Sequence, residues 1–200
     1  MKLLPTQYSE KIEAGTDEAG RGSLAGPVSA AAVIFPEDYS NPDLNDSKKL
    51  SKKKRNKLRK VIEKEALAFS VVHIDNHEID KINILNASIL AMHKAIKKLK
   101  IIPEFILVDG NRFSKYENLK HKCIVSGDSK FQNIAAASIL AKSYRDELMI
   151  KLDKKHPHYN WKNNKGYPTK FHKKSLILHG PSIYHRKSFR LFDIQMKLGF

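Results

Sequence analysis

Five short apolar runs along the chain predict β-strands. Residues 28–35 are apolar and end in β-branched side chains, while residues 12–17 form a shorter, mixed run directly before a glycine-rich turn. Short runs bounded by turn residues are typical of paired strands, so we expect these two to pair through the turn. Residues 70–75 alternate, and residues 105–108 are fully apolar, as in a strand buried on both faces. A fifth brief strand is expected at 123–125.

Apolar residues three and four positions apart predict the helices, because one face of an α-helix repeats with that spacing. A basic helix is expected from an N-cap at Ser51 to about residue 68, and long helices are expected at 82–99 and 131–153. A shorter helix at 169–179 would close at a Gly-Pro pair. The expected buried stripes are Leu58, Ile62, Ala66 and Phe69; Ile82, Leu85, Ile89, Met92, Ile96 and Leu99; and Ile134, Ser138, Ala141, Leu148 and Leu152, with Arg145 in register.

The order of these elements predicts an α/β fold in which α-helices flank a mixed β-sheet. The order is strand, strand, helix, strand, helix, strand, strand, helix, helix, and a last helix is expected at 188–198. Four small residues at 135–138 would let the longest helix approach the sheet closely. No internal repeat or low-complexity linker divides the chain, so we expect one domain over 1–200, with a small helical C-terminal region over about 160–200.

The charge balance of the chain favours a polyanionic partner. Lysine and arginine total 37 against 21 acidic residues, which gives a formal net charge of +16. Nucleic acid is the first class of partner that such an excess indicates, and an anionic membrane surface is the second. The abundance of Lys, Asn and Ile is also typical of a genome-wide amino-acid preference, so charge alone does not show whether the positive excess reflects an anionic partner or the composition of the genome.

Several protein classes are excluded by what the sequence lacks. No apolar run reaches the roughly 18 residues that span a bilayer. The first residues lack the apolar core of a signal peptide. A single cysteine, Cys123, excludes both an internal disulfide framework and a Cys-rich zinc site. We therefore expect a cytoplasmic protein that binds no membrane.

Carboxylates follow three of the expected strands, each time beside glycine. Asp17 and Glu18 lie together in a tight glycine turn, Asp109 ends the fourth strand, and Asp128 follows the fifth. Ligand sites collect where strands end along one edge of an open sheet, although a solvated turn would also place an acid there. Carboxylates facing each other repel unless cations neutralise them. Oxygen ligands point to Mg²⁺ or Mn²⁺, and two such ions could clamp an in-line phosphoryl displacement.

Seven short motifs, read in order, resemble those of the ribonuclease HII family. No single motif is decisive, but together they run from residue 15 to about residue 190. The motifs are Asp-Glu-Ala-Gly-Arg-Gly at 17–22, Asn-Asp-Ser-Lys-Lys-Leu-Ser at 45–51, Val-Asp-Gly-Asn at 108–111, Gly-Asp-Ser at 127–129, Ala-Ala-Ser-Ile-Leu-Ala-Lys at 136–142 with Arg145 and Asp146, Gly-Tyr-Pro-Thr at 166–169 with His172, and Gly-Pro-Ser at 180–182 with His185 and Arg186. One departure is Ser23, where proline is common in the family.

The resemblance implies a ribonuclease H-like fold and a metal-dependent endonuclease. Such an enzyme cuts the RNA strand of RNA–DNA hybrids. It also cuts duplex DNA on the 5′ side of single ribonucleotides, leaving 3′-hydroxyl and 5′-phosphate ends. The catalytic, metal-binding carboxylates of the family match Asp17, Glu18, Asp109 and Asp128. Mg²⁺ or Mn²⁺ is the implied cofactor, with two ions expected when substrate is bound.

The resemblance also assigns substrate contacts. The family's ribonucleotide-reading loop matches residues 20–22, whose backbone would contact the 2′-hydroxyl, the one group that separates RNA from DNA at a given site. Tyr167 is similar to the tyrosine that stacks on the neighbouring sugar, with a core or interface tyrosine as the alternative. The lysines at 48–49 are expected to hold backbone phosphates. The substrate-binding residues expected are therefore Gly20, Arg21, Gly22, Lys48, Lys49 and Tyr167.

Three features of the chain remain open at this point. Arg145 and Asp146 either brace the active site through a charge network or form a peripheral salt bridge. The tail at 195–200 faintly resembles a sliding-clamp-binding tail, and a simple helix end is the alternative we favour. We expect a monomer whose region 160–200 contributes to substrate binding.

Two rival functions fit parts of the same pattern. A resolvase-like nuclease of the ribonuclease H superfamily would use similar carboxylates but cut all-DNA substrates. A catalytically silent hybrid-binding protein would need the positive charge alone. The carboxylates at three strand ends count against this second rival, because without ions they would weaken phosphate binding.

Overall fold

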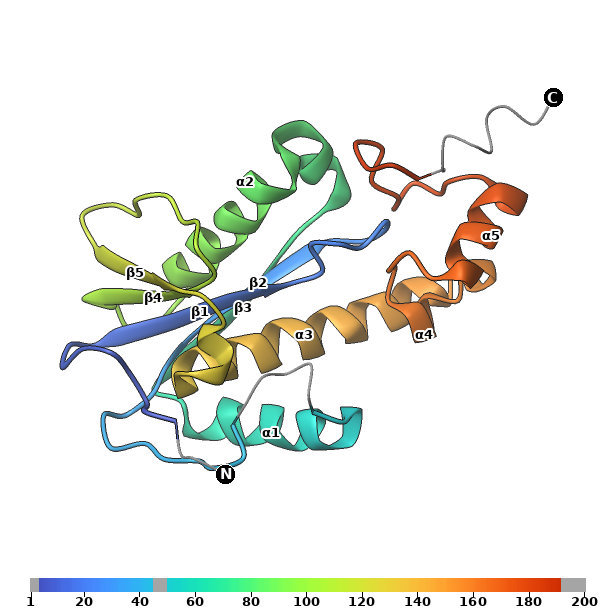
Figure 1. Ribbon diagram of the computed structural model, residues 1–200. Coiled ribbons are helices and arrows are strands. Elements are labelled where there is room, and N and C mark those ends of the chain that lie inside the picture. Colours follow the sequence, from blue (N-terminus) through green and yellow to red (C-terminus); the bar gives the residue numbers. More distant parts are fainter. Residues whose placement is uncertain (1–3, 45–49, 192–200) are drawn as a thin grey trace.

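The fold is a mixed five-stranded sheet between two layers of helices, with a helical region beyond one end of the sheet (Figure 1). The computed structural model describes residues 4–44 and 50–191. Figure 1 shows α2 on one face of the sheet, α1 and α3 on the other, and α4 and α5 near the far end of α3. The strands are β1 (Glu13–Ala19), β2 (Val28–Ile34), β3 (Ala68–Ile74), β4 (Phe105–Asp109) and β5 (Lys120–Ile124). The helices are α1 (Lys52–Glu65), α2 (Asn76–Lys97), α3 (Gln132–Asp153), α4 (Trp161–Asn164) and α5 (Lys170–His179), with 3-10 turns η1 (Gly127–Ser129) and η2 (Pro157–Tyr159).

The strand order β3-β2-β1-β4-β5 confirms the predicted mixed sheet. β1 and β2 pair antiparallel through the glycine-rich turn, as expected, and β2 pairs antiparallel with β3. β1, β4 and β5 run parallel to one another. Their C-terminal ends therefore meet at one edge of the sheet, which is where the predicted carboxylates lie.

Strand β2 shows how the two layers share the sheet. Successive side chains of a strand point to opposite faces. Val28, Ala30 and Ala32 belong to the hydrophobic cluster beneath α2, whereas Ala31 and Val33 belong to the cluster beneath α1 and α3. All seven residues of β2 are buried, so the strand lacks the polar alternation of a solvated sheet.

Several elements have other bounds than those expected, and α2 begins at Asn76, six residues before its predicted start. α1 begins after the predicted N-cap Ser51, whose side chain accepts from the Lys54 N–H, but it ends at Glu65 because Ala66 takes an extended backbone. Phe69 therefore lies in β3 and not on the helix. β5 starts earlier than predicted. It is an edge strand, and its exposed lysines hid its first residues from a prediction that relied on apolar runs. Val125, which was expected in the strand, lies beyond it and is 60% exposed.

Helix α2 buries alanines where a stripe of large apolar residues was expected. Asn83 breaks the helix with φ 66° and ψ 166°, which turns the two halves relative to each other. Ala87, Ala91 and Ala95 are fully buried, while Ile82, Leu85 and Ile89 of the predicted stripe are only half-buried. Met92, Ile96 and Leu99 are buried as predicted. Small residues on this line let α2 lie close to β2.

Helix α3 lies directly against β1. The small residues at 135–138 are buried, as predicted. A Cβ atom built on Gly15 of β1 would lie 2.4 Å from the backbone carbonyl carbon of Asn133, so helix and strand approach too closely for a side chain at that position. Further along α3, Met149 is fully buried, whereas the predicted Leu148 and Leu152 are half-buried.

The C-terminal region packs against the distal half of α3. A third hydrophobic cluster joins Leu24 and Met149 to Tyr159, Trp161 and Leu176. Residues 188–191 form no helix, and the rest of the helix predicted at 188–198 lies outside the described residues. Within 4–44 and 50–191, no helix is both long and apolar enough to cross a membrane.

The close contact between β1 and α3 gives a first prediction. Replacing Gly15→Ala should lower the free energy of unfolding by about 1–3 kcal/mol or more, because the new methyl group has no space. Gly22→Ala is the matched control, since a Cβ there meets no atom within 4 Å. Urea unfolding of both variants measures the difference. Equal midpoints for the two variants would contradict the proposed contact.

Candidate active site

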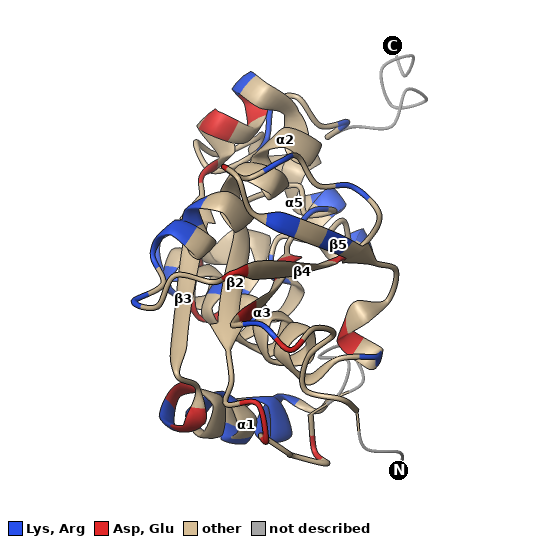
Figure 2. Cartoon of the chain, turned by 90° about the vertical axis from the view of Figure 1, so that its left-hand side faces the viewer, with Lys and Arg blue, Asp and Glu red and all other residues tan. Residues whose placement is uncertain are grey.

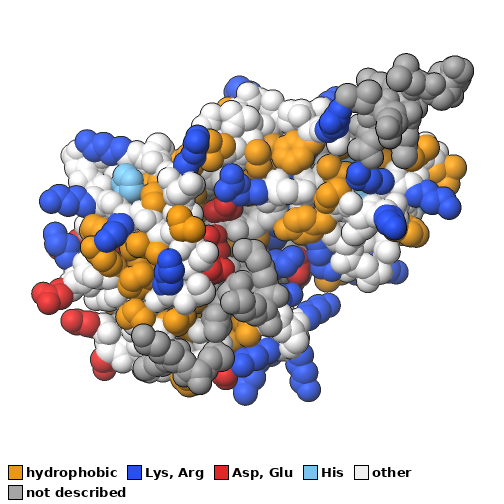
Figure 3. All heavy atoms as spheres, viewed as in Figure 1, with side chains coloured by type: hydrophobic (Ala, Val, Ile, Leu, Met, Phe, Trp, Pro, Cys, Tyr) orange, Lys and Arg blue, Asp and Glu red, His pale blue; other side chains and the backbone are white. Residues whose placement is uncertain are grey.

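One cleft at the carboxyl end of the parallel strands gathers most of the predicted functional residues. Its volume is about 670 Å³, and three of the predicted carboxylates line it, namely Asp17, Glu18 and Asp109. The loop at 20–22 and Tyr167 line the same cleft. Figure 3 shows acidic side chains gathered near the centre of this face, with lysine and arginine side chains around them.

Asp17 and Glu18 occupy the end of a strand and not the glycine turn that the sequence indicated. β1 continues to Ala19, so the two neighbouring side chains point to opposite faces of the sheet. Asp17 lies on the α3 face, where it receives a hydrogen bond from Ser138. Glu18 lies on the α2 face, where its Oε1 atom accepts from Arg21 Nη1 at 3.2 Å. The strand thus delivers two carboxylates to one cleft from two sides.

Asp17 is the most strongly perturbed of these carboxylates. It is 4% exposed. Burial first, and then the negative charges of Glu18 and Asp109, raise the pKa of Asp17 well above its usual range, against the hydrogen bond from Ser138. The cleft therefore favours a positive partner at Asp17, either a proton or a cation.

Asp109 and Asp128 lie in contact with the same short turn. The Oδ1 atom of Asp109 accepts the Gly127 N–H at 2.7 Å, so the start of η1 orients the end of β4. Asp128 follows in η1 and is 4% exposed, and it does not line the cleft. Among the described residues, no group of three or more Asp, Glu, His or Cys side chains is arranged to hold one metal ion. A site made by all four predicted carboxylates stays a prediction.

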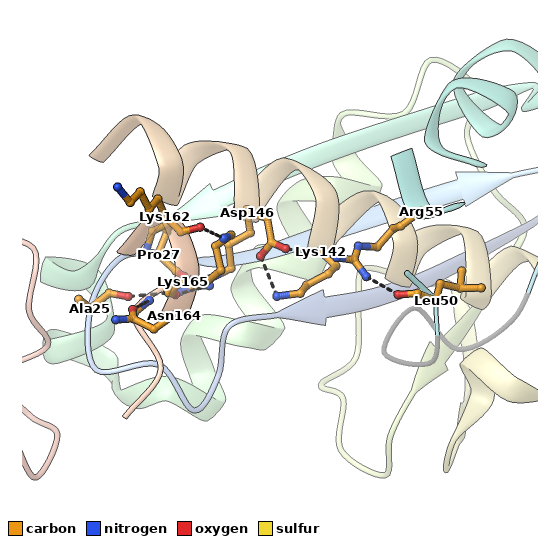
Figure 4. Close-up of polar contacts among 11 residues, drawn as sticks. Ala25, Pro27, Leu50, Arg55, Lys142, Asp146, Lys162, Asn164 and Lys165 are labelled. Carbon is orange, nitrogen blue, oxygen red and sulfur yellow. Dashed lines mark hydrogen bonds and ion pairs between the residues drawn. The ribbon is translucent and has the colours of Figure 1, made fainter. Parts of the chain in front are cut away.

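Two cations that the sequence did not assign also line the cleft. Lys142 Nζ lies 2.7 Å from Asp146 Oδ1, and Arg55 Nη2 lies 3.5 Å from Asp146 Oδ2, so one carboxylate holds both (Figure 4). Arg55 also donates to the Leu50 carbonyl at 3.0 Å. The sequence contained a signal for both residues. Arg55 belongs to the basic run at the start of α1, which Figure 2 shows in blue, and Lys142 is the last residue of the motif at 136–142.

Two fully buried arginines support the turn between β1 and β2. Arg145 and Arg186 are both 0% exposed, and neither forms an ion pair among the residues that the structure describes. Burial, and then the positive charge of Arg145, lower the pKa of Arg186 to about 9, so Arg186 remains a cation at neutral pH. Arg145 donates to the carbonyls of Pro27 at 2.8 Å, Lys165 at 2.9 Å and Ala25 at 3.2 Å, and Arg186 donates to those of Gly26 at 3.0 Å, Arg21 at 2.8 Å and Gly20 at 2.7 Å.

This arrangement changes the interpretation of Arg145 and Asp146. Asp146 belongs to a charge network at the cleft, through Lys142 and Arg55. Arg145, the preceding residue of α3, is fully buried, and its side chain donates hydrogen bonds to backbone carbonyls. The two residues therefore have separate tasks.

Tyr167 is held at the edge of the cleft by its own backbone and by cations near its ring. Its carbonyl oxygen contacts His172 Nδ1 at 3.0 Å and accepts the Thr169 N–H at 2.8 Å. The Lys142 ammonium and the Arg145 guanidinium lie 5.4 and 5.5 Å from the ring centroid. The ring is half-buried, with one side available to the cleft.

A buried pair of histidines supports the segment that carries Tyr167. His172 Nδ1 faces a carbonyl and must donate, so its Nε2 atom accepts from Trp161 Nε1 at 3.1 Å. His185 Nδ1 accepts the Ser182 N–H at 2.9 Å, which leaves its Nε2–H to donate to His172 Nε2 at 3.1 Å. Both rings are therefore neutral: a proton on His172 Nε2 would oppose two N–H groups, and a proton on His185 Nδ1 would oppose the Ser182 N–H.

Two predictions fall on parts of the chain outside the described residues. Lys48 and Lys49 lie in the undescribed segment at 45–49, and the tail at 195–200 lies beyond residue 191. Their expected roles stay predictions.

Comparison with known proteins gives one family over nearly the whole chain. A model of the ribonuclease HII family matches residues 14–192. The ribonuclease HII of Parabacteroides distasonis is 59% identical over 198 residues, covering 99% of this chain and 100% of that protein. The structure is similar to that of the ribonuclease H2 from Pyrococcus horikoshii, with 26% identity, a TM-score of 0.73 and coverage of 90% of this chain and 94% of that one. It also shares its fold with the RNase HII in a structure of the PCNA:RNase HII complex from Archaeoglobus fulgidus, at 23% identity and a TM-score of 0.75 over 91% of this chain and 96% of that one.

The histidine pair predicts a loss of stability in mild acid. Burial, and then the nearby His172, lower the pKa of His185 to about 3, and burial also lowers the pKa of His172. Below about pH 6.5 these histidines bind protons in the unfolded chain but not in the folded chain. The free energy of unfolding therefore falls as the pH drops from about 6.5 towards 3. His185 contributes up to about 1.4 kcal/mol per pH unit in this range, and His172 adds to the loss in the same direction.

The variant His185→Gln should remove one histidine's share of this loss, because an amide N–H replaces Nε2–H but cannot be protonated. Urea unfolding at pH 7.5 and 5.5 should show a pH-dependent drop that is smaller by about 1.4 kcal/mol than in the unaltered protein. His77→Gln, at an exposed position, is the control and should leave the drop unchanged. An unchanged drop in His185→Gln would refute the neutral pair.

Proposed function

Because this chain belongs to the ribonuclease HII family, and is a ribonuclease H-type endonuclease, we propose two substrates for it. It cuts the RNA strand of RNA–DNA hybrids, and it cuts duplex DNA on the 5′ side of a single embedded ribonucleotide. Both reactions leave a 3′-hydroxyl and a 5′-phosphate. The observation that carries the proposal is the shared cleft, in which three carboxylates lie beside the loop at 20–22 and Tyr167.

The donor set of the cleft fits a divalent cation with oxygen ligands. Asp17, Glu18 and Asp109, together with Asp128, would hold Mg²⁺ or Mn²⁺, with two ions when substrate is bound. The raised pKa of Asp17 supports this, since a cation would relieve the same repulsion as a proton. When bound, such ions stabilise charge on the attacked phosphate and lower the pKa of water.

The chain's own side chains would bind and orient the nucleic acid around this centre. Arg55 and Lys142, held together by Asp146, place two positive charges in the lining of the same cleft, where they would bind the phosphate backbone. The net charge of +16 supports binding along a longer stretch of duplex. Tyr167 would stack on the sugar next to the ribonucleotide, and its place in the lining of the cleft supports this role. Lys48 and Lys49 are proposed to hold further phosphates.

Selectivity for ribose would come from the loop at 20–22. The 2′-hydroxyl is the group that distinguishes the target from its DNA neighbours. Backbone donors at the loop lie beside the carboxylates, so the sugar that is recognised and the bond that is cut would be neighbours.

The proposed setting is the cytoplasm, with the chain acting as a monomer and the region 160–200 contributing to substrate binding. A sliding-clamp contact through the tail at 195–200 is part of the same proposal. Its support is the PCNA complex named for the archaeal RNase HII of similar fold.

A duplex with one ribonucleotide tests the proposed function directly. Cleavage should occur on its 5′ side in the presence of Mg²⁺ or Mn²⁺, and should be absent without either ion. The same duplex made entirely of DNA is the control. Equal cutting of both duplexes would support the resolvase-like rival, and tight binding without any metal-dependent turnover would support the silent hybrid-binding rival.

The role of Asp109 gives a second prediction at this site. Asp109→Asn should lower the cleavage rate by about 10²-fold or more, the scale of losing one preorganised electrostatic group. Substrate affinity should survive, because one negative charge is removed near a polyanion. Asp38→Asn, at an exposed position away from the cleft, matches the change in charge and should cut normally. Near-normal cleavage by Asp109→Asn would overturn the metal assignment.

A further inference from the structure

The loop at 20–22 is held from beneath by a residue from the far end of the chain. Arg186 Nη2 donates to the Gly20 carbonyl at 2.7 Å, and Arg186 Nη1 donates to the Arg21 carbonyl at 2.8 Å. The third donor, Nε, binds the Gly26 carbonyl at 3.0 Å. One guanidinium therefore fixes two successive peptide groups of the loop and the end of the same turn.

The planarity of the peptide group gives this contact a consequence on the opposite side. In a trans peptide, the C=O of one residue points away from the N–H of the next. With the carbonyls of Gly20 and Arg21 directed at one buried guanidinium, the N–H groups of Arg21 and Gly22 point away from it. Arg21 and Gly22 are exposed and line the cleft, so the outward direction is towards the cleft.

These two N–H groups have no acceptor among the residues that the structure describes. The Gly20 carbonyl is already shared between Arg186 and the Ser23 N–H, at 3.3 Å, which closes the turn. Successive N–H groups that point the same way form a small concave site for an oxygen atom. The loop thus presents two donors to whatever oxygen of the substrate enters the cleft.

The turn has little freedom to adopt another shape. Gly20 has φ +95°, which side chains disfavour, and a Cβ there would lie 2.0 Å from Arg145 Nε. Arg145 holds the carbonyls of Ala25 and Pro27 further along the same turn. The guanidinium of Arg186 is what sets the peptides at 20–22, because no other side chain among the described residues binds both carbonyls.

We propose that Arg186 is the positioning residue for ribose selectivity: by binding the carbonyls of Gly20 and Arg21, it aims the N–H groups of Arg21 and Gly22 at the 2′-oxygen of the substrate. The inference rests on the proposed function of the loop. Arg186 itself is fully buried and touches no substrate. It acts only through the backbone that it holds.

A purely structural arginine would give a different experimental result. If Arg186 only stabilised the fold, its replacement would weaken binding to every duplex alike. If it aims the two donors, its replacement weakens binding to a ribonucleotide-containing duplex and leaves binding to DNA unchanged. The ratio of the two affinities separates these roles.

The test compares Arg186→Lys with Arg190→Lys, which change the same residue type by the same amount and keep the charge. Lysine cannot span two carbonyls with the fixed fork of a guanidinium. Arg190 is exposed and serves as the control. Affinities are measured with Ca²⁺ in place of Mg²⁺, for one duplex with a single ribonucleotide and for the identical all-DNA duplex.

Arg186→Lys should lower the ribose-to-deoxyribose affinity ratio roughly tenfold, the scale of one well-formed hydrogen bond, with DNA affinity unchanged. Arg190→Lys should keep the ratio of the unaltered protein. An unchanged ratio in Arg186→Lys, or an equal fall for both duplexes, would overturn the inference. A lack of ribose preference in the unaltered protein would instead overturn the proposed function.

A second measurement covers the case in which Arg186→Lys does not fold. In the unaltered protein labelled with ¹⁵N, the amide signals of Arg21 and Gly22 should shift on addition of the ribonucleotide-containing duplex and not on addition of the all-DNA duplex. Equal shifts with both duplexes would show that the two N–H groups do not read the 2′-oxygen, and the inference would fail.

Discussion

The structure depends on two buried cations that carbonyl dipoles stabilise in place of carboxylates. Burying an arginine costs free energy unless the nitrogens of its guanidinium are hydrogen-bonded. Arg145 and Arg186 meet this condition with six backbone carbonyls, five of them in the turn at 20–27 between β1 and β2. Moving that turn would leave two buried guanidinium groups without most of their hydrogen-bond acceptors. The constraint therefore makes a glycine-rich turn rigid and ties it to α3 and to the C-terminal region.

On the other side of the turn, negative charges gather, and neither Asp17 nor Asp109 has a compensating cation in an ion pair among the described residues. Parallel β1 and β4 end at one edge and bring Asp17, Glu18 and Asp109 to one cleft, where burial and mutual repulsion raise the pKa of Asp17. This cluster favours a proton or a cation, whereas the two arginine charges are already stabilised by carbonyl dipoles. The loop at 20–22 lies between the two clusters. A cleft that favours a cation next to a turn held by fixed arginines suits the reaction that we propose, in which one sugar is recognised and the chain is cut beside it.

The buried histidine pair connects Tyr167 to the support of the loop. His172 holds the Tyr167 carbonyl, and His185 is the neighbour of Arg186 in sequence. The segment carrying the predicted sugar-stacking ring and the segment carrying the loop's support are thus joined by one hydrogen bond between two neutral rings. The C-terminal region reaches the cleft through these contacts, although the domain boundaries expected from the sequence stay a prediction.

Local patterns in the sequence determined the order of elements, the mixed sheet, the excess of positive charge and the placing of acids at three strand ends. These follow from periodicity and from turn residues, which act over a few positions. Tertiary structure alone decided that Asp17 and Glu18 face opposite sides of β1, that alanines line the buried face of α2, and that Asp146 holds Arg55 and Lys142. It also decided that Arg186 supports Gly20 across 166 positions of the chain. The physical reason is that a carbonyl carries no residue-specific signal, so the partner of a buried arginine emerges only when the backbone has folded around it.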